Sequence, residues 1–187
     1  MDTWRGRVVE ADNVDVQQLS LEELLEKVRR HHEKTLEERI PHLEALIDKF
    51  EPSHHEDECE EFAMMTSGQL MKCREVLERH LASEEEYLFP YVEQLIAAAE
   101  SGEEAPGRPE YLDEEFESEH QEVLEELESV REVAGSYSIP DDAREEFVEL
   151  DQALVQFEEE LSERLRVEEE TLLDRVADLE DYLADGE

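Results

Sequence analysis

The chain has 187 residues, with 57 acidic side chains against 17 basic ones and a formal net charge of −40. That charge repels nucleic acid and anionic membrane surfaces, so neither is expected as a partner. High net charge also favours disorder, but 39% of the residues are hydrophobic and they recur at regular spacing. We therefore expect one folded domain with a sizeable core and the acidic, lysine-poor surface that is typical of a salt-rich cytoplasm.

The beginning of the chain shows no periodic pattern, and we expect residues 1–19 to form an N-terminal arm. It lacks the apolar centre of a signal peptide. The longest apolar run in the chain, residues 95–99, has five residues, whereas a membrane-spanning helix needs about 18 or more. We therefore expect a cytoplasmic protein without a membrane segment.

Four long segments carry apolar residues at the spacing of an amphipathic helix. The first begins at Ser20-Leu-Glu-Glu, a capping-box pattern, and Pro41 and Pro90 are expected to bend the first and second helices. The pattern predicts an all-α, up-down four-helix bundle over residues 20–184. The segments are residues 20–50, 56–99, 110–134 and 141–183, and the connections between them are residues 51–55, 101–109 and 135–140.

His80 and Glu84 are polar residues on the apolar face of the second helix. They stand four residues apart and so lie one turn apart on the same face. Val76, Leu77 and Leu88 surround them at helical spacing. A buried charge costs several kcal/mol unless it is paired or coordinates a metal, so this pair predicts a partner inside the core.

The other three helices also place polar residues within their apolar stripes. His32 falls in the middle of the first stripe and His31 at its edge. His120 is central in the third stripe, and Glu168 lies among the leucines of the fourth. All four helices therefore direct at least one imidazole or carboxylate inward.

Each of these residues also has an ordinary structural interpretation. A single core histidine is more often hydrogen-bonded than metal-bound, and Glu168 alone could pair with Arg39 or Arg164. The convergence of all four helices favours a metal site instead. Neutral imidazoles and carboxylates together suit iron, manganese or zinc, and two glutamates can bridge two metal ions.

Three segments of the sequence are HHE at 31–33, HLASEEEYLFP at 80–90 and ESEHQE at 117–122. With them, residues 20 to about 180 resemble the hemerythrin-like, HHE cation-binding domain family, and particularly its di-iron iron-centre repair branch. The family repeats His-x-x-x-Glu-Glu-x-x-Leu-Phe-Pro in the second segment. The resemblance implies a four-helix bundle that holds two irons. The implied histidine ligands are His32, His80 and His120, and the implied bridging carboxylates are Glu84 and Glu168.

Two features depart from the family pattern. The fourth helix has Arg164 where the family has its fourth histidine, and arginine cannot give up its proton to bind a cation. The guanidinium could pair with Glu168 instead. Residues 1–19 are also too short for the cysteine-containing N-terminal domain of the repair proteins. The spacing of the first helix leaves the choice between His31 and His32 open.

The first functional hypothesis is a metal-binding bundle that is non-catalytic or weakly redox-active. It would hold iron, as a di-iron or a mononuclear centre, or another divalent metal. It would sense, store or transfer iron, or bind O2 or NO, and a protein partner or a homodimer is compatible with it. For a single metal, the favoured ligands are His32, His80 and Glu84, because they do not depend on the altered fourth helix.

Two other hypotheses stay open. In the first, Arg164 and Glu168 form a buried ion pair, and a metal-free bundle acts as an interaction or regulatory module. The second is a ferritin-like carboxylate oxidase, which needs two Glu-x-x-His motifs, and here only Glu117 and His120 offer one. Enzyme activity is not indicated, because the sequence has neither a Gly-rich phosphate loop nor a nucleophile elbow.

Overall fold

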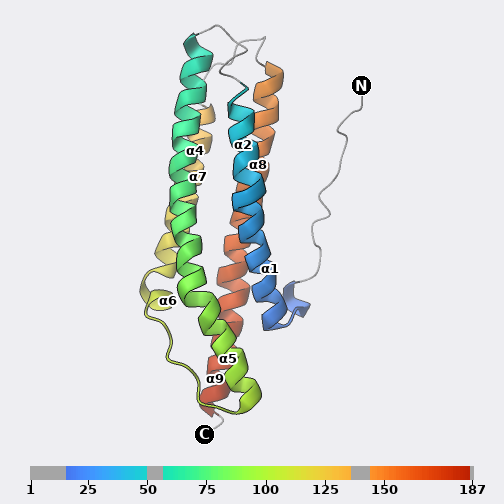
Figure 1. Ribbon diagram of the computed structural model, residues 1–187, viewed down its shortest axis with the longest axis vertical. Coiled ribbons are helices and arrows are strands. Elements are labelled where there is room, and N and C mark those ends of the chain that lie inside the picture. The colour runs from blue at the N-terminus through green and yellow to red at the C-terminus, as the bar shows by residue number, and fades with distance from the viewer. Residues whose placement is uncertain (1–15, 50–56, 136–143, 186–187) are drawn as a thin grey trace.

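The computed structural model describes residues 16–49, 57–135 and 144–185. These residues form helices and their connections, with no strand among them. Four long helical rods lie side by side (Figure 1), which confirms the predicted all-α, four-helix fold. Most of the predicted N-terminal arm and the predicted connections at 51–55 and 135–140 lie outside the described residues, apart from Val16–Leu19 and Gly135.

Each rod is a run of consecutive helical elements, and three of the rods change from α-helix to π-helix and back along their length. In chain order the elements are η1 (Val16–Gln18), α1 (Leu21–Lys34), η2 (Thr35–Arg39), α2 (Ile40–Ile47), α4 (Asp57–Ser83), η3 (Glu84–Leu88), α5 (Phe89–Ser101), α6 (Tyr111–Glu114), α7 (Phe116–Gly135), α8 (Arg144–Val167), η4 (Glu168–Leu173) and α9 (Asp174–Asp185). The π-helical elements are η2, η3 and η4.

Local sequence signals define two of the helix ends. At the start of α1, the Glu23 N–H donates to Ser20 Oγ over 3.1 Å and the Ser20 N–H donates to Glu23 Oε2 over 2.8 Å. This is the predicted capping box. At the end of α5, Gly102 adopts a left-handed conformation with φ of 69°, which glycine adopts without a steric penalty.

The two prolines expected to bend the helices each follow a π-helical segment. Pro41 comes directly after η2 and the first residue of α2, and Pro90 stands in the same relation to η3 and α5. At the second site the Phe89 N–H donates to the Glu84 carbonyl, five residues earlier. Proline lacks an N–H and its ring clashes with the carbonyl four residues back, so a wider turn accommodates it. The π segment η4 contains no proline, and the sequence analysis did not anticipate it.

The hydrophobic core consists of two clusters of buried residues. One lies between α2, α4, α7 and α8 and includes Phe62, Leu77 and Phe157. The other lies between α1, α5, α9 and the start of α7, and includes Leu95 and Phe116. The buried histidines, glutamates and Arg164 lie on the elements where these two clusters meet, so a polar layer interrupts an otherwise apolar interior.

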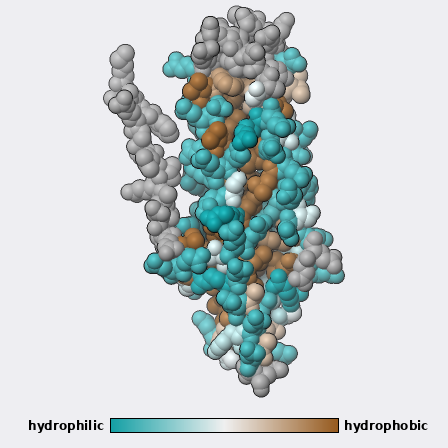
Figure 2. Space-filling model, turned by 180° about the vertical axis from the view of Figure 1, so that it is seen from behind, coloured by the Kyte–Doolittle hydropathy of each residue, from teal (hydrophilic) through white to brown (hydrophobic). Residues whose placement is uncertain are grey.

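The outer surface is dominated by polar side chains. The face shown in Figure 2 is mostly hydrophilic, with hydrophobic residues visible in narrow areas between the helices. Cross-helix ion pairs are part of this surface, such as Arg29–Glu93 at 2.7 Å between α1 and α5. No helix in the described ranges has the length and hydrophobicity that crossing a bilayer requires.

Candidate metal centre

The polar layer receives one or two buried side chains from each rod. In the second and fourth rods these side chains lie where α-helix gives way to π-helix, since Glu84 is the first residue of η3 and Glu168 the first residue of η4. Helix segments of this kind occur frequently at functional sites. The buried polar residues of the layer, with 0–5% of their surface exposed, are His32, His80, Glu84, His120, Arg164 and Glu168.

Four of these residues converge on one point. His80, Glu84, His120 and Glu168 can each offer one ligand atom such that all four atoms lie within 4.8 Å of one another. Nε2 of His80 lies 3.5 Å from Glu84 Oε2, and Nε2 of His120 lies 3.4 Å from Glu168 Oε2. Two ligands on a common metal with bonds of about 2.0–2.2 Å are separated by about 3.0–3.5 Å in tetrahedral or octahedral geometry. These spacings therefore fit a shared ion.

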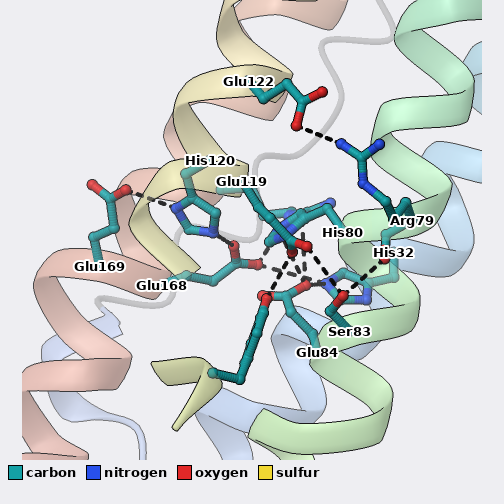
Figure 3. Close-up of polar contacts among 12 residues, drawn as sticks. His32, Arg79, His80, Ser83, Glu84, Glu119, His120, Glu122, Glu168 and Glu169 are labelled. Atoms are coloured by element: carbon teal, nitrogen blue, oxygen red, sulfur yellow. Dashed lines mark hydrogen bonds and ion pairs between the residues drawn. The ribbon is translucent and has the colours of Figure 1, made fainter. Parts of the chain in front are cut away.

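The converging atoms do not hydrogen-bond to one another. Nε2 of His80, Nε2 of His120, both oxygens of Glu84 and Oε2 of Glu168 are buried, with no hydrogen-bond partner in the part of the chain that the structure describes. Buried polar atoms are nearly always satisfied, and an unpaired buried carboxylate is costly. Since each of the four residues offers an atom at the same place (Figure 3), a cation there would satisfy these atoms together.

The opposite nitrogens of the same two histidines are held by carboxylates. Nδ1 of His80 donates to Glu119 Oε2 at 3.3 Å, and Nδ1 of His120 donates to Glu169 Oε1 at 2.7 Å (Figure 3). Such outer carboxylates fix the tautomer and orientation of metal-ligating imidazoles, and they make the other nitrogen more basic. Both histidines thus present Nε2 as a lone-pair donor toward the site.

Glu119 is itself anchored by two further donors. It accepts from the Tyr111 hydroxyl at 2.9 Å and from Ser83 Oγ at 3.3 Å. Burial by itself would raise the pKa of the Glu119 carboxyl, but its contacts with His80 and Tyr111 outweigh that effect and lower it. Glu119 therefore remains an anion that accepts the Nδ1 proton of His80.

His32 approaches the two glutamates from another side. Its Nε2 lies 2.9 Å from Glu84 Oε2 and 3.6 Å from Glu168 Oε1, but it is not part of the converging group of four. Its Nδ1 is buried and has no partner among the described residues. Burial alone would lower the pKa of His32, yet the contacts with Glu168 and Glu84 raise it. His31, the alternative candidate, is only half-buried.

Arg164 brings a positive charge into the same layer. Its Nε donates to Glu168 Oε1 at 2.9 Å, and its Nη2 lies 3.7 Å from Glu84 Oε2. Burial alone would raise the pKa of Glu168, but the charge of Arg164 and the neighbouring His32 and His120 hold it well below its usual range. Burial lowers the pKa of His120 to about 3, so its ring is neutral near pH 7.

Aromatic rings of one hydrophobic cluster pack against the histidines of the layer. Phe116 lies 4.2 Å from His120 and 6.1 Å from His80, measured between ring centroids, and Phe89 lies 5.2 Å from His32. Both phenylalanines are almost fully buried. A low-dielectric environment of this kind strengthens every electrostatic interaction between the carboxylates and a cation.

The five residues predicted from the sequence as ligands are all buried in this layer, and four of them form the converging group. The sequence analysis did not identify the outer carboxylates Glu119 and Glu169. The available signal was chemical, because a buried ligating imidazole needs an acceptor for its other nitrogen. Glu117, half of the possible Glu-x-x-His motif, is exposed.

Comparisons with known proteins do not identify a relative. No protein-family model matches the chain, and neither the curated proteins nor the solved structures contain a significant match.

Proposed function

We propose that this chain is a metal-binding four-helix bundle of the hemerythrin-like type, with up-down topology, that holds a divalent metal ion, iron by the family resemblance. The ligands would be His80, Glu84, His120 and Glu168, with His32 beside them. One observation supports this most directly. Two imidazoles and two carboxylates, all buried, each offer one ligand atom at one point, and Nε2 of both imidazoles has no hydrogen-bond partner among the described residues.

The residues fit such an ion in charge and in chemistry. Two carboxylates and two imidazoles suit a first-row metal such as iron, manganese or zinc. Glu119 and Glu169 hold the imidazoles from behind. When bound, the ion would supply coordination positions not taken by protein ligands, which suit a small molecule such as O2 or NO. The buried rings of Phe89 and Phe116 pack against the histidines, and this apolar setting favours binding, sensing or transfer over hydrolytic chemistry.

The metal analysis of purified protein tests this proposal. Protein produced with iron in the medium and purified in high salt is expected to retain at least one iron per chain. The variant His80→Ala is expected to lose it. His42→Ala is the matched control, because His42 is an exposed histidine on α2, and it is expected to bind as much metal as the wild type.

A second candidate function rests on the ion pair between Arg164 and Glu168. That contact, at 2.9 Å, already neutralises one buried carboxylate without a metal. In this alternative the bundle is a metal-free interaction or regulatory module. Wild-type protein that takes up no iron, zinc or manganese, together with a His80→Ala variant as stable as the wild type, would favour it over metal binding.

A further inference from the structure

Arg164 is a fully charged side chain in the interior, with 2% of its surface exposed. Its guanidinium contacts both carboxylates of the polar layer, Glu168 directly and Glu84 at 3.7 Å. Its two terminal nitrogens have no hydrogen-bond partner in the described ranges. The arginine therefore acts on Glu84 as a positive charge without a hydrogen bond, whereas it also donates a hydrogen bond to Glu168 from Nε.

The second and fourth rods place equivalent residues at equivalent positions. His80 precedes Glu84 by four residues near the end of α4, and Arg164 precedes Glu168 by four residues near the end of α8. In both rods the glutamate is the first residue of a π segment. The fourth rod thus presents a guanidinium where the second presents an imidazole, and the guanidinium cannot act as a ligand.

The position of Arg164 disfavours a second divalent ion more than the total charge does. Glu84, Glu168 and Arg164 sum to −1, and the outer carboxylates Glu119 and Glu169 bring the total to −3, so one divalent ion leaves −1 and a second would leave +1. At an effective dielectric constant of 20, a single positive charge about 5 Å away weakens the binding of a divalent ion by on the order of 10⁵-fold. A second divalent ion near Arg164 would meet that repulsion and would also lack a ligand from α8.

The two oxygens of Glu168 show how the layer is divided. Oε2 faces His120 at 3.4 Å, and Oε1 faces Arg164 at 2.9 Å. We propose that Arg164 is a built-in cation that takes the place of a second metal ion, so that the layer binds a single divalent ion between His80, Glu84, His120 and Glu168. This inference rests on the proposed metal-binding function and specifies its stoichiometry.

The test is a count of metal ions in the wild type and in Arg164→His. Metal-free protein is loaded with excess Zn²⁺ or Co²⁺, freed of unbound metal and analysed by mass spectrometry for metal and protein content. We expect one ion per chain for the wild type and two for Arg164→His. Arg166→His is the matched control, because Arg166 is an exposed arginine two residues away, and it should retain one ion.

A second variant keeps the test decisive if Arg164→His does not fold. Arg164→Met removes the positive charge without adding a ligand. We expect it to bind the first Zn²⁺ at least about tenfold more tightly than the wild type does, as measured by competition with a chelator. Unchanged affinity in Arg164→Met would overturn the proposed role of the charge.

The possible outcomes separate this inference from the proposed function. Two ions per wild-type chain would overturn the inference and leave the metal-binding function standing. One ion in the folded Arg164→His variant would also overturn it, because the arginine would then not be what limits the stoichiometry. A wild type that binds no ion would defeat the proposed function itself, and the inference with it.

Discussion

The two sides of the buried polar layer face the same pair of carboxylates, yet they are built differently. On one side, His80 and His120 each have Nδ1 bound to an outer carboxylate and Nε2 directed at the converging point. On the other side, Nδ1 of His32 has no partner among the described residues, and Arg164 supplies a permanent positive charge. The side with His80 and His120 has the geometry proposed to bind a cation. The side with Arg164 already contains a positive charge, the guanidinium.

The difference between the histidines lies in the partner of Nδ1. His32 is as close to Glu84 as a hydrogen bond requires, but among the described residues no acceptor holds its Nδ1. Glu119 and Glu169 are the acceptors for Nδ1 of the other two histidines. If the proposed metal site is correct, we expect the outer carboxylates to determine which imidazoles act as its ligands.

The largest expected effect comes from removing a histidine on each side in turn. His80→Ala should weaken Zn²⁺ binding by more than about a hundredfold, since loss of a ligand exceeds the typical effect of an outer-shell change. His32→Ala should weaken it by less than about tenfold. Chelator competition measures both. Equal losses in the two variants would place His32 among the metal ligands and remove the distinction between the sides.

Removing the positive charge of Arg164 should have its main effect on the stability of the metal-free protein. Arg164→Met leaves Glu168 and Glu84 buried without their nearest positive group, and breaking a buried ion pair in this way costs about 3–5 kcal/mol. Urea unfolding of the metal-free protein in high salt measures this change. Arg166→Met, at an exposed ion pair, should change the free energy of unfolding by less than about 0.5 kcal/mol. A similar small change in Arg164→Met would show that the guanidinium does not stabilise the carboxylates.

The outer carboxylates should have an intermediate effect. Glu119→Gln and Glu169→Gln remove the negative charge behind His80 and His120, and each should reduce metal affinity by about tenfold to a hundredfold. Chelator competition for Zn²⁺ measures these losses of affinity. Glu122→Gln and Glu170→Gln, on the same two rods but paired with the arginines Arg79 and Arg166 at the surface, should leave the affinity unchanged. Affinity losses in these controls would point to a general effect of charge.

The smallest expected effect concerns the hydroxyl group behind Glu119. Tyr111→Phe removes the hydrogen bond to Glu119, which is worth about 1 kcal/mol, and should weaken metal binding by about fivefold at most. Tyr87→Phe is the control, because Tyr87 packs against the ring of Tyr111 and is 41% exposed. If Tyr111→Phe matches Glu119→Gln in its effect, the hydroxyl group has a larger role than anchoring the carboxylate.

The sequence alone was sufficient for the features that depend on neighbouring residues. Helical periodicity identified the four helical segments and the inward positions of His32, His80, Glu84, His120 and Glu168, because spacing along a helix fixes the face on which a side chain lies. The capping box at Ser20 was also predicted. Each of these features is set within a few turns of one helix, where the chain itself determines the geometry.

Only the tertiary structure decided what lies opposite each inward side chain. The position of a residue along its own helix does not fix how far that helix is shifted against its neighbours. Glu119 of α7 therefore accepts a hydrogen bond from His80 of α4 and not from its neighbour His120, which donates to Glu169 of η4. The π segment η4 contains no proline, and the sequence pattern did not predict it either. Packing between the rods brought four predicted residues to one point and placed His32 with Arg164 beside it, because axial register is set by contacts between helices distant in sequence.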